Sequence, residues 1–259
     1  MAADFGNTAR DYAAYRTGFP AGLFTRLAAL GIGLPGQRVA DFGTGTGALA
    51  RGFAAGGCAV TGVDVAPEML SQARRADAAA GLEIAYRVGP AEDTGLAAGA
   101  WDVVSAGQCW HWFDRRRAAA EAHRLLAAGG AIAICYRDYV VAPGNVCAAS
   151  EEVVLAHNPG WAMAGWTGIP AGYAAELGEA GFTGMEMFGF GMTVPFTHEA
   201  WRGRMRTCNG VGASLPEAGV AAFDADLARL LRERFPQEPL LVPHWISALV
   251  ARPGPGTCG

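Results

Sequence analysis

The sequence predicts an α/β fold centred on a doubly wound, mostly parallel β-sheet. Between residues 37 and 135, short apolar runs alternate with helical patterns, and this β-α-β rhythm builds parallel sheets. The chain has 259 residues, of which 51% are hydrophobic, enough to fill one substantial core. A turn of alternating glycines, GTGTG at residues 43–47, follows the first apolar run directly, so the first strand is expected to turn tightly into a helix.

Five strands and three helices are expected in this central region. The candidate strands are Arg38–Phe42, Ala59–Val63, Glu83–Val88, Asp102–Ala106 and Ala131–Tyr136. Helical patterns near 46–55, 67–79 and 115–127 separate some of them. Pro67 suits the first turn of its helix, because the N–H that proline lacks would have had no partner there.

The flanking segments are expected to add further helices and strands. A helix over Ala21–Leu30 precedes the central region, and a helix near 145–157 follows it. The segment NPGWAMAGWTGIP, residues 158–170, is rich in glycine, proline and tryptophan and is expected to form a loop or lid. Beyond it we expect a strand at Met185–Phe196, two helices, and a last strand at Leu240–Ala251.

One domain is expected over residues 1–259, because the chain shows no internal repeat and no long linker. Its core is expected at 35–140, preceded by an N-terminal helical segment at 1–34. Cap insertions are expected at about 140–180 and 197–236, partly covering the sheet.

The composition excludes several classes of partner. Net charge is −4, and all twenty basic residues are arginine, so no nucleic-acid partner is expected, since such proteins carry a basic excess. The first thirty residues lack a signal-peptide pattern and no apolar run is long enough to span a bilayer, so a cytoplasmic protein without a membrane partner is expected. A lysine-free, alanine- and arginine-rich chain is typical of GC-rich bacterial genomes.

The cysteines and histidines indicate neither a disulfide framework nor a metal site. Six cysteines stand at irregular spacings without a C-x-x-C pair, which favours buried free thiols in a chain of this size. Five histidines show no H-x-x-x-H or similar pattern, so no metal is expected.

The glycine turn has three interpretations. A tight connection between strand and helix can simply tolerate glycine. Gly43, Gly45 and Ala48 also satisfy the G-x-G-x-x-G/A pattern of nicotinamide dinucleotide sites, with Asp64 placed where a ribose-binding acid is expected. The third interpretation is the nucleotide turn of a methyltransferase, and it is supported by more of the sequence.

The chain resembles class I S-adenosylmethionine-dependent methyltransferases from about residue 10 to 136. Their hallmark, D/E-x-G-x-G-x-G, stands at residues 41–47 as DFGTGTG, and the acid that ends their second strand stands as Asp64 in GVDVAPEML. Three further similar segments follow in the family's order: GPAEDTGL (89–96), WDVVSAGQCWHWFD (101–114) and EAHRLLAAGGAIAI (121–134).

This resemblance implies a Rossmann-like seven-stranded sheet, mostly parallel with an antiparallel C-terminal strand, and a helical cap. The residues HWFD at 111–114 resemble small-molecule enzymes such as the trans-aconitate and quinone-pathway methyltransferases. One departure is Pro90, which stands where relatives often carry an acid, so a side-chain contact to adenine is lost at that position.

Charge favours the methyl donor over a dinucleotide at this turn. A pyrophosphate binds at the positive end of a helix and is repelled by a carboxylate such as Asp41, two residues before the first glycine. S-adenosyl-L-methionine has no phosphate and carries an ammonium and a sulfonium, so the same carboxylate favours it. Glycines, which lack Cβ, allow the backbone to approach the donor closely.

The resemblance also implies a set of donor-binding residues. Asp64 is expected to accept both ribose hydroxyls, and the alternative is an acid that only caps the next helix. Val65 and Met69 are expected against the adenine, and Glu92 near its edge, where its side chain is otherwise plain surface. Arg16 is expected to pair with the donor's carboxylate. The complete expected set is Tyr15, Arg16, Asp41, Gly43, Thr44, Gly45, Gly47, Asp64, Val65, Met69, Ala91, Glu92, Ala106 and Gln108.

The acceptor is expected beyond the fourth strand, beside the segment AGQCWHWFD. His111 is the expected catalytic base, because an ordinary histidine pKa near 6.5 suits deprotonation of a hydroxyl at neutral pH; a packing role is the alternative. Tyr15 is the second catalytic candidate, lining the acceptor pocket, which Trp110 and Trp112 are expected to wall. Large apolar residues in the cap are consistent with a hydrophobic small molecule, and an acid bound by arginine is the alternative.

The expected function is transfer of the sulfonium methyl to an oxygen or carbon of a small-molecule acceptor, such as a secondary metabolite, by a monomer or homodimer. The donor is already activated, so the protein mainly has to align the reacting atoms and exclude water. The alternatives are a methyltransferase-like protein that uses the donor pocket for cyclisation or decarboxylation, a binding protein with a relic turn, and a nicotinamide oxidoreductase.

Overall fold

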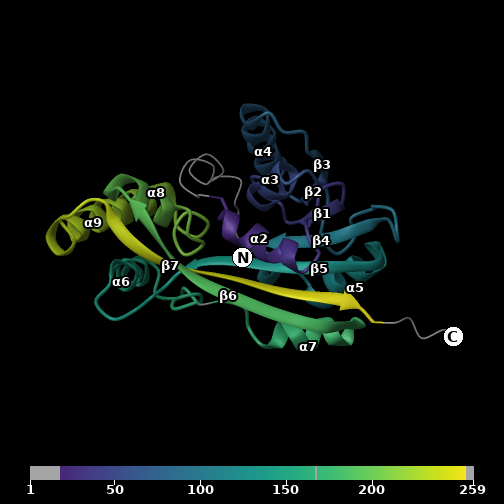
Figure 1. Cartoon of the computed structure of the whole chain (residues 1–259). Coiled ribbons are helices and arrows are strands. Elements are labelled where there is room, and N and C mark those ends of the chain that lie inside the picture. Colours follow the sequence, from purple (N-terminus) through teal and green to yellow (C-terminus); the bar gives the residue numbers. More distant parts are fainter. Residues whose placement is uncertain (1–17, 167, 255–259) are drawn as a thin grey trace. The chain divides into compact units, whose positions relative to one another are not determined.

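A computed structural model describes residues 18–166 and 168–254, which contain a seven-stranded sheet (Figure 1). The strand order is β3-β2-β1-β4-β5-β7-β6; neighbours among β1 to β5 are parallel, and β7 is antiparallel. The predicted α/β class and mixed sheet are therefore confirmed. From the central β1 the chain builds first towards β3 and then, through β4, towards the other edge. Ligands of open α/β sheets bind beyond the carboxyl ends of the strands at such a switch point.

The strands lie close to their predicted positions. They are β1 (Arg38–Phe42), β2 (Ala59–Asp64), β3 (Ala85–Val88), β4 (Trp101–Gly107), β5 (Leu126–Tyr139), β6 (Phe182–Phe196) and β7 (Leu240–Pro253). The largest difference is at β5, which begins where a helix was predicted to continue to residue 127. That helix ends at Leu125, because Leu126 is extended (φ −68°, ψ 133°) and pairs with Trp101 of β4.

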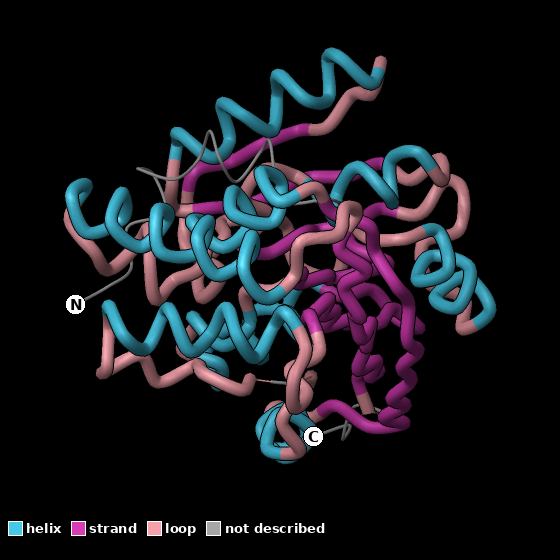
Figure 2. Tube along the Cα trace, turned by 90° about the vertical axis from the view of Figure 1, so that its left-hand side faces the viewer, coloured by secondary structure: helices cyan, strands magenta, loops and turns pink. Residues whose placement is uncertain are grey.

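Figure 2 shows the helices and strands of the described residues in different colours. The helices are α2 (Ala21–Ala29), α3 (Ala48–Ala55), α4 (Pro67–Ala80), the 3₁₀ turn η2 (Trp110–Trp112), α5 (Arg115–Leu125), α6 (Val146–His157), α7 (Gly172–Glu179), α8 (His198–Arg206) and α9 (Glu217–Arg234). Sequence patterns did not predict α7, whose eight residues include two glycines. Within the described ranges, no helix is both long and apolar enough to cross a bilayer.

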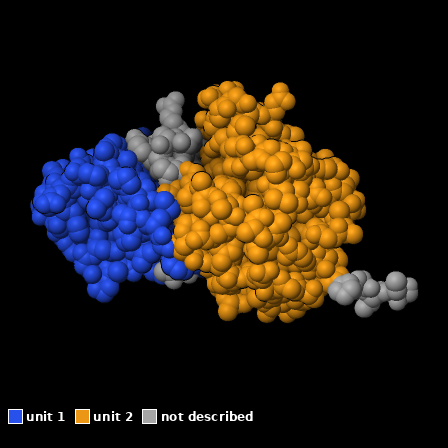
Figure 3. All heavy atoms as spheres, viewed as in Figure 1, with its two compact units in different colours: residues 1–17, 138–168, 191–245 blue, residues 18–137, 169–190, 246–259 orange. Residues whose placement is uncertain are grey.

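The chain forms two compact units (Figure 3). Unit 1 contains the described residues 138–166, 168 and 191–245, and unit 2 contains 18–137, 169–190 and 246–254. The glycine turn and His111 both belong to unit 2. The single-domain organisation with cap insertions stays a prediction.

Helix α3 packs closely against α2 in unit 2. It buries Leu49, Ala50 and Phe53, and the Phe53 ring meets Phe24 of α2 edge-on at 5.3 Å between centroids. Gly52 leaves the space that the Phe24 ring occupies, since a Cβ built on Gly52 would lie 1.8 Å from Phe24 Cζ. The close approach of these two helices therefore depends on glycine at this position.

Replacing Gly52 with alanine is expected to lower the free energy of unfolding by about 1–3 kcal/mol, because the added methyl group forces Phe24 to move. Urea unfolding of the pure protein measures the change. Gly178→Ala in α7 is the matched control: its Cβ meets only Met185 Cε, at 3.7 Å, so better helix propensity should stabilise the protein slightly. Equal stability of Gly52→Ala and wild type would contradict this packing.

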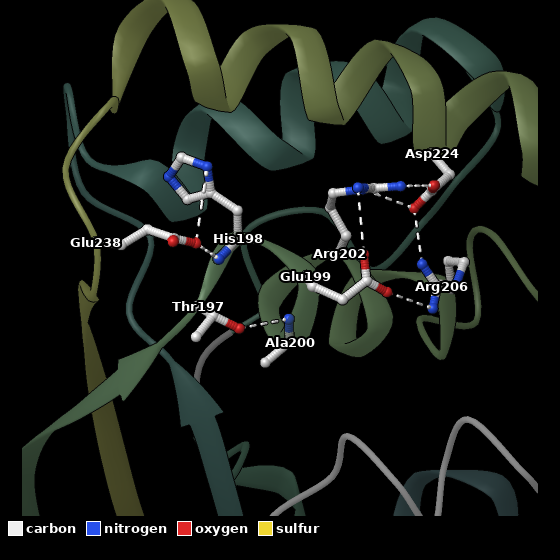
Figure 4. Close-up of polar contacts among 8 residues, drawn as sticks. All are labelled: Thr197, His198, Glu199, Ala200, Arg202, Arg206, Asp224 and Glu238. Atoms are coloured by element: carbon white, nitrogen blue, oxygen red, sulfur yellow. Dashed lines mark hydrogen bonds and ion pairs between the residues drawn. The ribbon is translucent and has the colours of Figure 1, made fainter.

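Unit 1 has its own apolar core and an ionic cluster on its helices. Trp201 and Met205 of α8 are fully buried among apolar side chains that include Phe223 of α9. On the other face of α8, Arg202 and Arg206 both donate to Asp224 of α9, and Glu199 pairs with the same two arginines (Figure 4). These arginines therefore connect α8 to α9.

Candidate functional site

The glycine turn and the residues that follow β4, here called the β4 exit, meet at one edge of the sheet. The parallel register pairs Phe42 with Val63 of β2 on one side and with Ala106 of β4 on the other. The carboxyl ends of these three strands therefore lie together. The residues that follow them, beginning with Gly43 and Gln108, come to the same edge, where open α/β sheets bind ligands.

All three glycines of the turn adopt left-handed backbone conformations. Gly43, Gly45 and Gly47 have φ values of 56°, 55° and 76°, which side-chain-bearing residues rarely adopt. A Cβ on Gly43 would also lie 2.8 Å from Phe113, and one on Gly47 would lie 2.6 Å from the Tyr86 hydroxyl. Packing within the protein thus requires these two glycines.

Gly45 differs, because a Cβ built on it would collide with none of the described residues. The nearest atoms to a Cβ built on Gly45 are Met69 Cε at 3.4 Å and a backbone oxygen at 4.0 Å. Among the described residues, a Cβ at this position would therefore make only ordinary van der Waals contacts. Gly45 is therefore the position in the turn at which a ligand could approach the backbone closely.

Asp64, the last residue of β2, holds the glycine turn in place with its carboxylate. One carboxylate oxygen accepts from Gly45 N at 2.8 Å and the other from Ala66 N at 2.9 Å. Ala66 directly precedes α4, so the helix-capping role considered from the sequence is present as well. Burial raises the pKa of Asp64, although these backbone donors oppose the shift. The carboxylate lone pairs that these donors leave unused can accept from a ligand hydroxyl.

Asp41 is buried beneath the turn, with only 1% of its surface exposed. Its carboxylate accepts from Ser105 Oγ of β4 at 2.6 Å. Burial raises its pKa to about 6, the Ser105 hydrogen bond lowers it, and the nearby Asp64 raises it. Because its side chain is buried, Asp41 could influence a ligand only through its charge.

The residues expected around adenine differ in their exposure. Val65 is 67% exposed directly after β2, and Met69 of α4 is 5% exposed. Ala91 is also buried. The Glu92 side chain accepts from Asp114 N at 2.8 Å, so it ties the segment after β3 to the start of α5. The exposed Val65 side chain is consistent with a ligand that packs against it.

The residues at the β4 exit are held by the sheet. Ala106 lies wholly buried in β4. Gln108 has φ 61°, unusual for a residue other than glycine, and its side-chain amide donates to Arg137 O beyond the middle of β5. Its backbone N–H donates to Cys135 O at 2.9 Å. A strained backbone conformation that hydrogen bonds hold in place is often found at functional sites.

His111 lies in η2 with two buried tyrosines beside it. Its Nδ1 is 2.9 Å from Tyr136 Oη, and Tyr136 Oη is 3.4 Å from Tyr173 Oη of α7. Of the two tryptophans expected to wall a pocket, Trp110 is fully buried and Trp112 is 45% exposed. His111 therefore has a hydrogen-bonded environment of the kind that positions a base.

Two expected site residues, Tyr15 and Arg16, lie outside the described residues. Conversely, the sequence patterns did not indicate Ser105, Tyr136 or Tyr173 as site residues. Ser105 and Tyr136 are parts of apolar strand patterns that predict core positions, and Tyr173 belongs to the helix that was not predicted. Only the fold brings them next to Asp41 and His111.

The residues present fit a nucleoside that carries positive charge and no phosphate. Two carboxylates, Asp41 and Asp64, lie at the turn. A phosphate group, which binds at the N-terminus of a helix, would be repelled by these carboxylates. The exposed Val65 offers an apolar surface beside the turn to a ligand with an apolar ring.

Comparisons with known proteins agree with this chemistry. A family described as a methyltransferase domain matches residues 40–134. An uncharacterised methyltransferase of Mycobacterium bovis is 32% identical over 136 residues, which cover 52% of this chain and 53% of that protein. The demethylmenaquinone methyltransferase of Thermus thermophilus is 38% identical over 101 residues, 38% of this chain and 46% of that protein. The chain thus spans about half the length of the curated relatives it matches.

A solved structure extends the likeness to most of the chain. A putative type II methyltransferase from Anaeromyxobacter dehalogenans is 26% identical, with a TM-score of 0.62, and the match covers 93% of this chain and all of that one. The matched region 40–134 holds the glycine turn, Asp64 and His111. Residues 40–134 therefore belong to the class I S-adenosylmethionine-dependent methyltransferase domain family that the turn resembles.

Proposed function

We propose that this protein transfers a methyl group from S-adenosyl-L-methionine to an oxygen or carbon of a small-molecule acceptor. The observation that carries the proposal is the turn itself. The Asp64 carboxylate accepts a hydrogen bond from Gly45 N, and a second carboxylate, Asp41, is buried nearby. When bound, the donor supplies a methyl group on a sulfonium, already activated for displacement.

The residues around the turn would hold this donor. Asp64 accepts the ribose hydroxyls with its remaining lone pairs, while its bonds to Gly45 and Ala66 fix its direction. Val65 contributes an apolar surface to the adenine. The ionised Asp41 favours the positive charge of the donor without touching it.

His111 is the proposed base for an acceptor hydroxyl or an acidic C–H. The support is its position at the β4 exit and its hydrogen bond to Tyr136. With a proton on Nδ1, the imidazole carries its lone pair on Nε2, the form in which a histidine accepts a proton. The names of relatives that act on quinone precursors, such as the Thermus thermophilus enzyme, support a small, partly apolar acceptor.

Incubation with methyl-labelled donor tests the function. We expect label to reach at least one member of a panel of phenols, quinols and enolisable ketones, with release of S-adenosylhomocysteine. Conversion of a panel compound without label would instead favour the cyclase or decarboxylase chemistry considered above and contradict methyl transfer.

Replacing His111 with glutamine is expected to lower kcat about 10²–10⁴-fold, because the acceptor then loses its base, while the dissociation constant of the donor stays within about twofold. Steady-state kinetics and calorimetry measure the two quantities. His157→Gln is the control, since His157 pairs with Asp226 in unit 1 and should leave kcat unchanged. An unchanged kcat in the His111 variant would remove the base from the proposal.

A further inference from the structure

A chain of three polar side chains leads from His111 into the interior of unit 2. His111 Nδ1 lies 2.9 Å from Tyr136 Oη, which in turn lies 3.4 Å from Tyr173 Oη. Only 1% of Tyr136 and 3% of Tyr173 are exposed. We propose that both tyrosines are positioning residues for His111, which they hold with its proton on Nδ1 and its lone pair on Nε2.

This inference rests on the proposed role of His111 as a base and specifies what gives it the correct tautomer. A phenol has one proton and also accepts. If Tyr136 donates to Nδ1, the imidazole proton must be on Nε2, and the nitrogen that should act as base is blocked. If Tyr136 turns its proton towards Tyr173, its oxygen accepts from Nδ1–H, and Nε2 keeps its lone pair.

The surroundings keep both phenols protonated. Burial raises the pKa of Tyr136 and of Tyr173, so neither becomes an anion that would hold His111 as a permanent cation at neutral pH. Tyr136 is thus a neutral acceptor for Nδ1–H, both before and after His111 takes a proton on Nε2. The acceptor's proton stays on His111, and the tyrosines exchange none.

Tyr173 is itself fixed by an ion pair between two helices. Arg115 of α5 makes two hydrogen bonds to Glu176 of α7, at 2.6 and 2.7 Å, and its guanidinium carbon lies 5.5 Å from the centre of the Tyr173 ring. Tyr173 and Glu176 are on the same helix, so this bidentate pair fixes the helix that carries Tyr173 against α5.

Nitrogen NMR of protein labelled only in its histidines tests the tautomer directly. Five histidines are present, and the His111→Gln variant identifies the His111 signals by their loss. In the wild type above the His111 pKa, we expect the signal of an unprotonated nitrogen at Nε2. In Tyr173→Phe, where the Tyr136 proton loses this acceptor, we expect a shift towards unprotonated Nδ1.

Kinetics separate positioning from a structural role. Tyr173→Phe and Tyr136→Phe should lower kcat about 10- to 100-fold with little change in the KM for the donor. Removal of the Tyr136 oxygen also destabilises the imidazolium, so the acid limb of the pH–rate profile should move to lower pH. Tyr139→Phe is the matched control: this buried tyrosine donates to Glu151 in unit 1, and its loss should leave kcat and the His111 signals unchanged.

The outcomes distinguish this inference from the proposed function. If neither tyrosine variant changes the His111 nitrogen signals, the positioning role is wrong, even in an active methyltransferase. Loss of the tautomer preference without any loss of kcat would also overturn it. If the wild type binds no donor and transfers no label, the proposed function fails, whereas the nitrogen spectra would still report the tyrosine chain.

Discussion

Replacing Asp41 with asparagine is expected to stabilise the protein and, at the same time, to weaken its binding of S-adenosyl-L-methionine. The buried carboxylate has a pKa raised to about 6 by burial, so keeping it ionised above that pH lowers stability. Asparagine has a similar shape, and the Ser105 hydroxyl can either donate to it or accept from it. We expect a gain of about 1–3 kcal/mol at pH 8 in the absence of the donor.

The sign of the pH dependence follows from the raised pKa. The folded protein holds the Asp41 proton more tightly than the unfolded chain, whose aspartates titrate near the ordinary value of 3.8. The contribution of Asp41 to stability therefore falls as pH rises from about 4 to about 6 and is constant above that. The advantage of Asp41→Asn should be full at pH 8 and disappear near pH 4, as measured by urea unfolding of both proteins.

Donor binding should show the opposite preference. An ionised Asp41 attracts the cationic donor, so wild-type affinity should rise as pH increases through 6, and Asp41→Asn should bind on the order of tenfold more weakly at pH 8. Ser247→Ala is a control, because it changes a buried hydroxyl of β7 away from the turn. A variant that is less stable than the wild type at pH 8, or that binds the donor equally well, would contradict this account of Asp41.

Replacing Asp64 with asparagine is expected to reduce donor affinity about 100-fold or more. The variant loses the charge that accepts ribose hydroxyls. Only one atom of its amide, the oxygen, accepts, so either the Gly45 N–H or the Ala66 N–H loses its acceptor. Calorimetric titration measures the dissociation constant directly.

Asp102→Asn is the matched control for this change. Asp102 also accepts from a backbone N–H, that of Arg38, but at the opposite end of the parallel strands. It should therefore lose stability without losing donor affinity. Equal affinities for wild type and Asp64→Asn, or equal losses in the two variants, would show that Asp64 does not contact the donor.

The sheet could be predicted from the sequence because its strands are short, apolar and separated by clear helical patterns. Errors arose where local preference and tertiary pairing disagree. Leu126 favours a helix, yet pairing with Trp101 makes it extended. Helix α7 escaped prediction because it is short and contains glycine, and it buries only Tyr173 and Leu177.

The site was predictable only where residues close in sequence define it. The turn and Asp64 form a motif whose spacing is visible along the chain. Burial of Asp41 under the turn, by contrast, depends on its strand neighbour Ser105, 64 residues away in sequence. Tyr136 and Tyr173 meet His111 only through the sheet and α7, so no local pattern could have indicated them.

Calorimetric titration of the wild-type protein with S-adenosyl-L-methionine, and in parallel with NADH, tests the central claim most directly. A turn flanked by Asp41 and Asp64 should bind the cationic, phosphate-free nucleoside and show no heat of binding with the dinucleotide. Binding of NADH in the absence of any binding of S-adenosyl-L-methionine would contradict it.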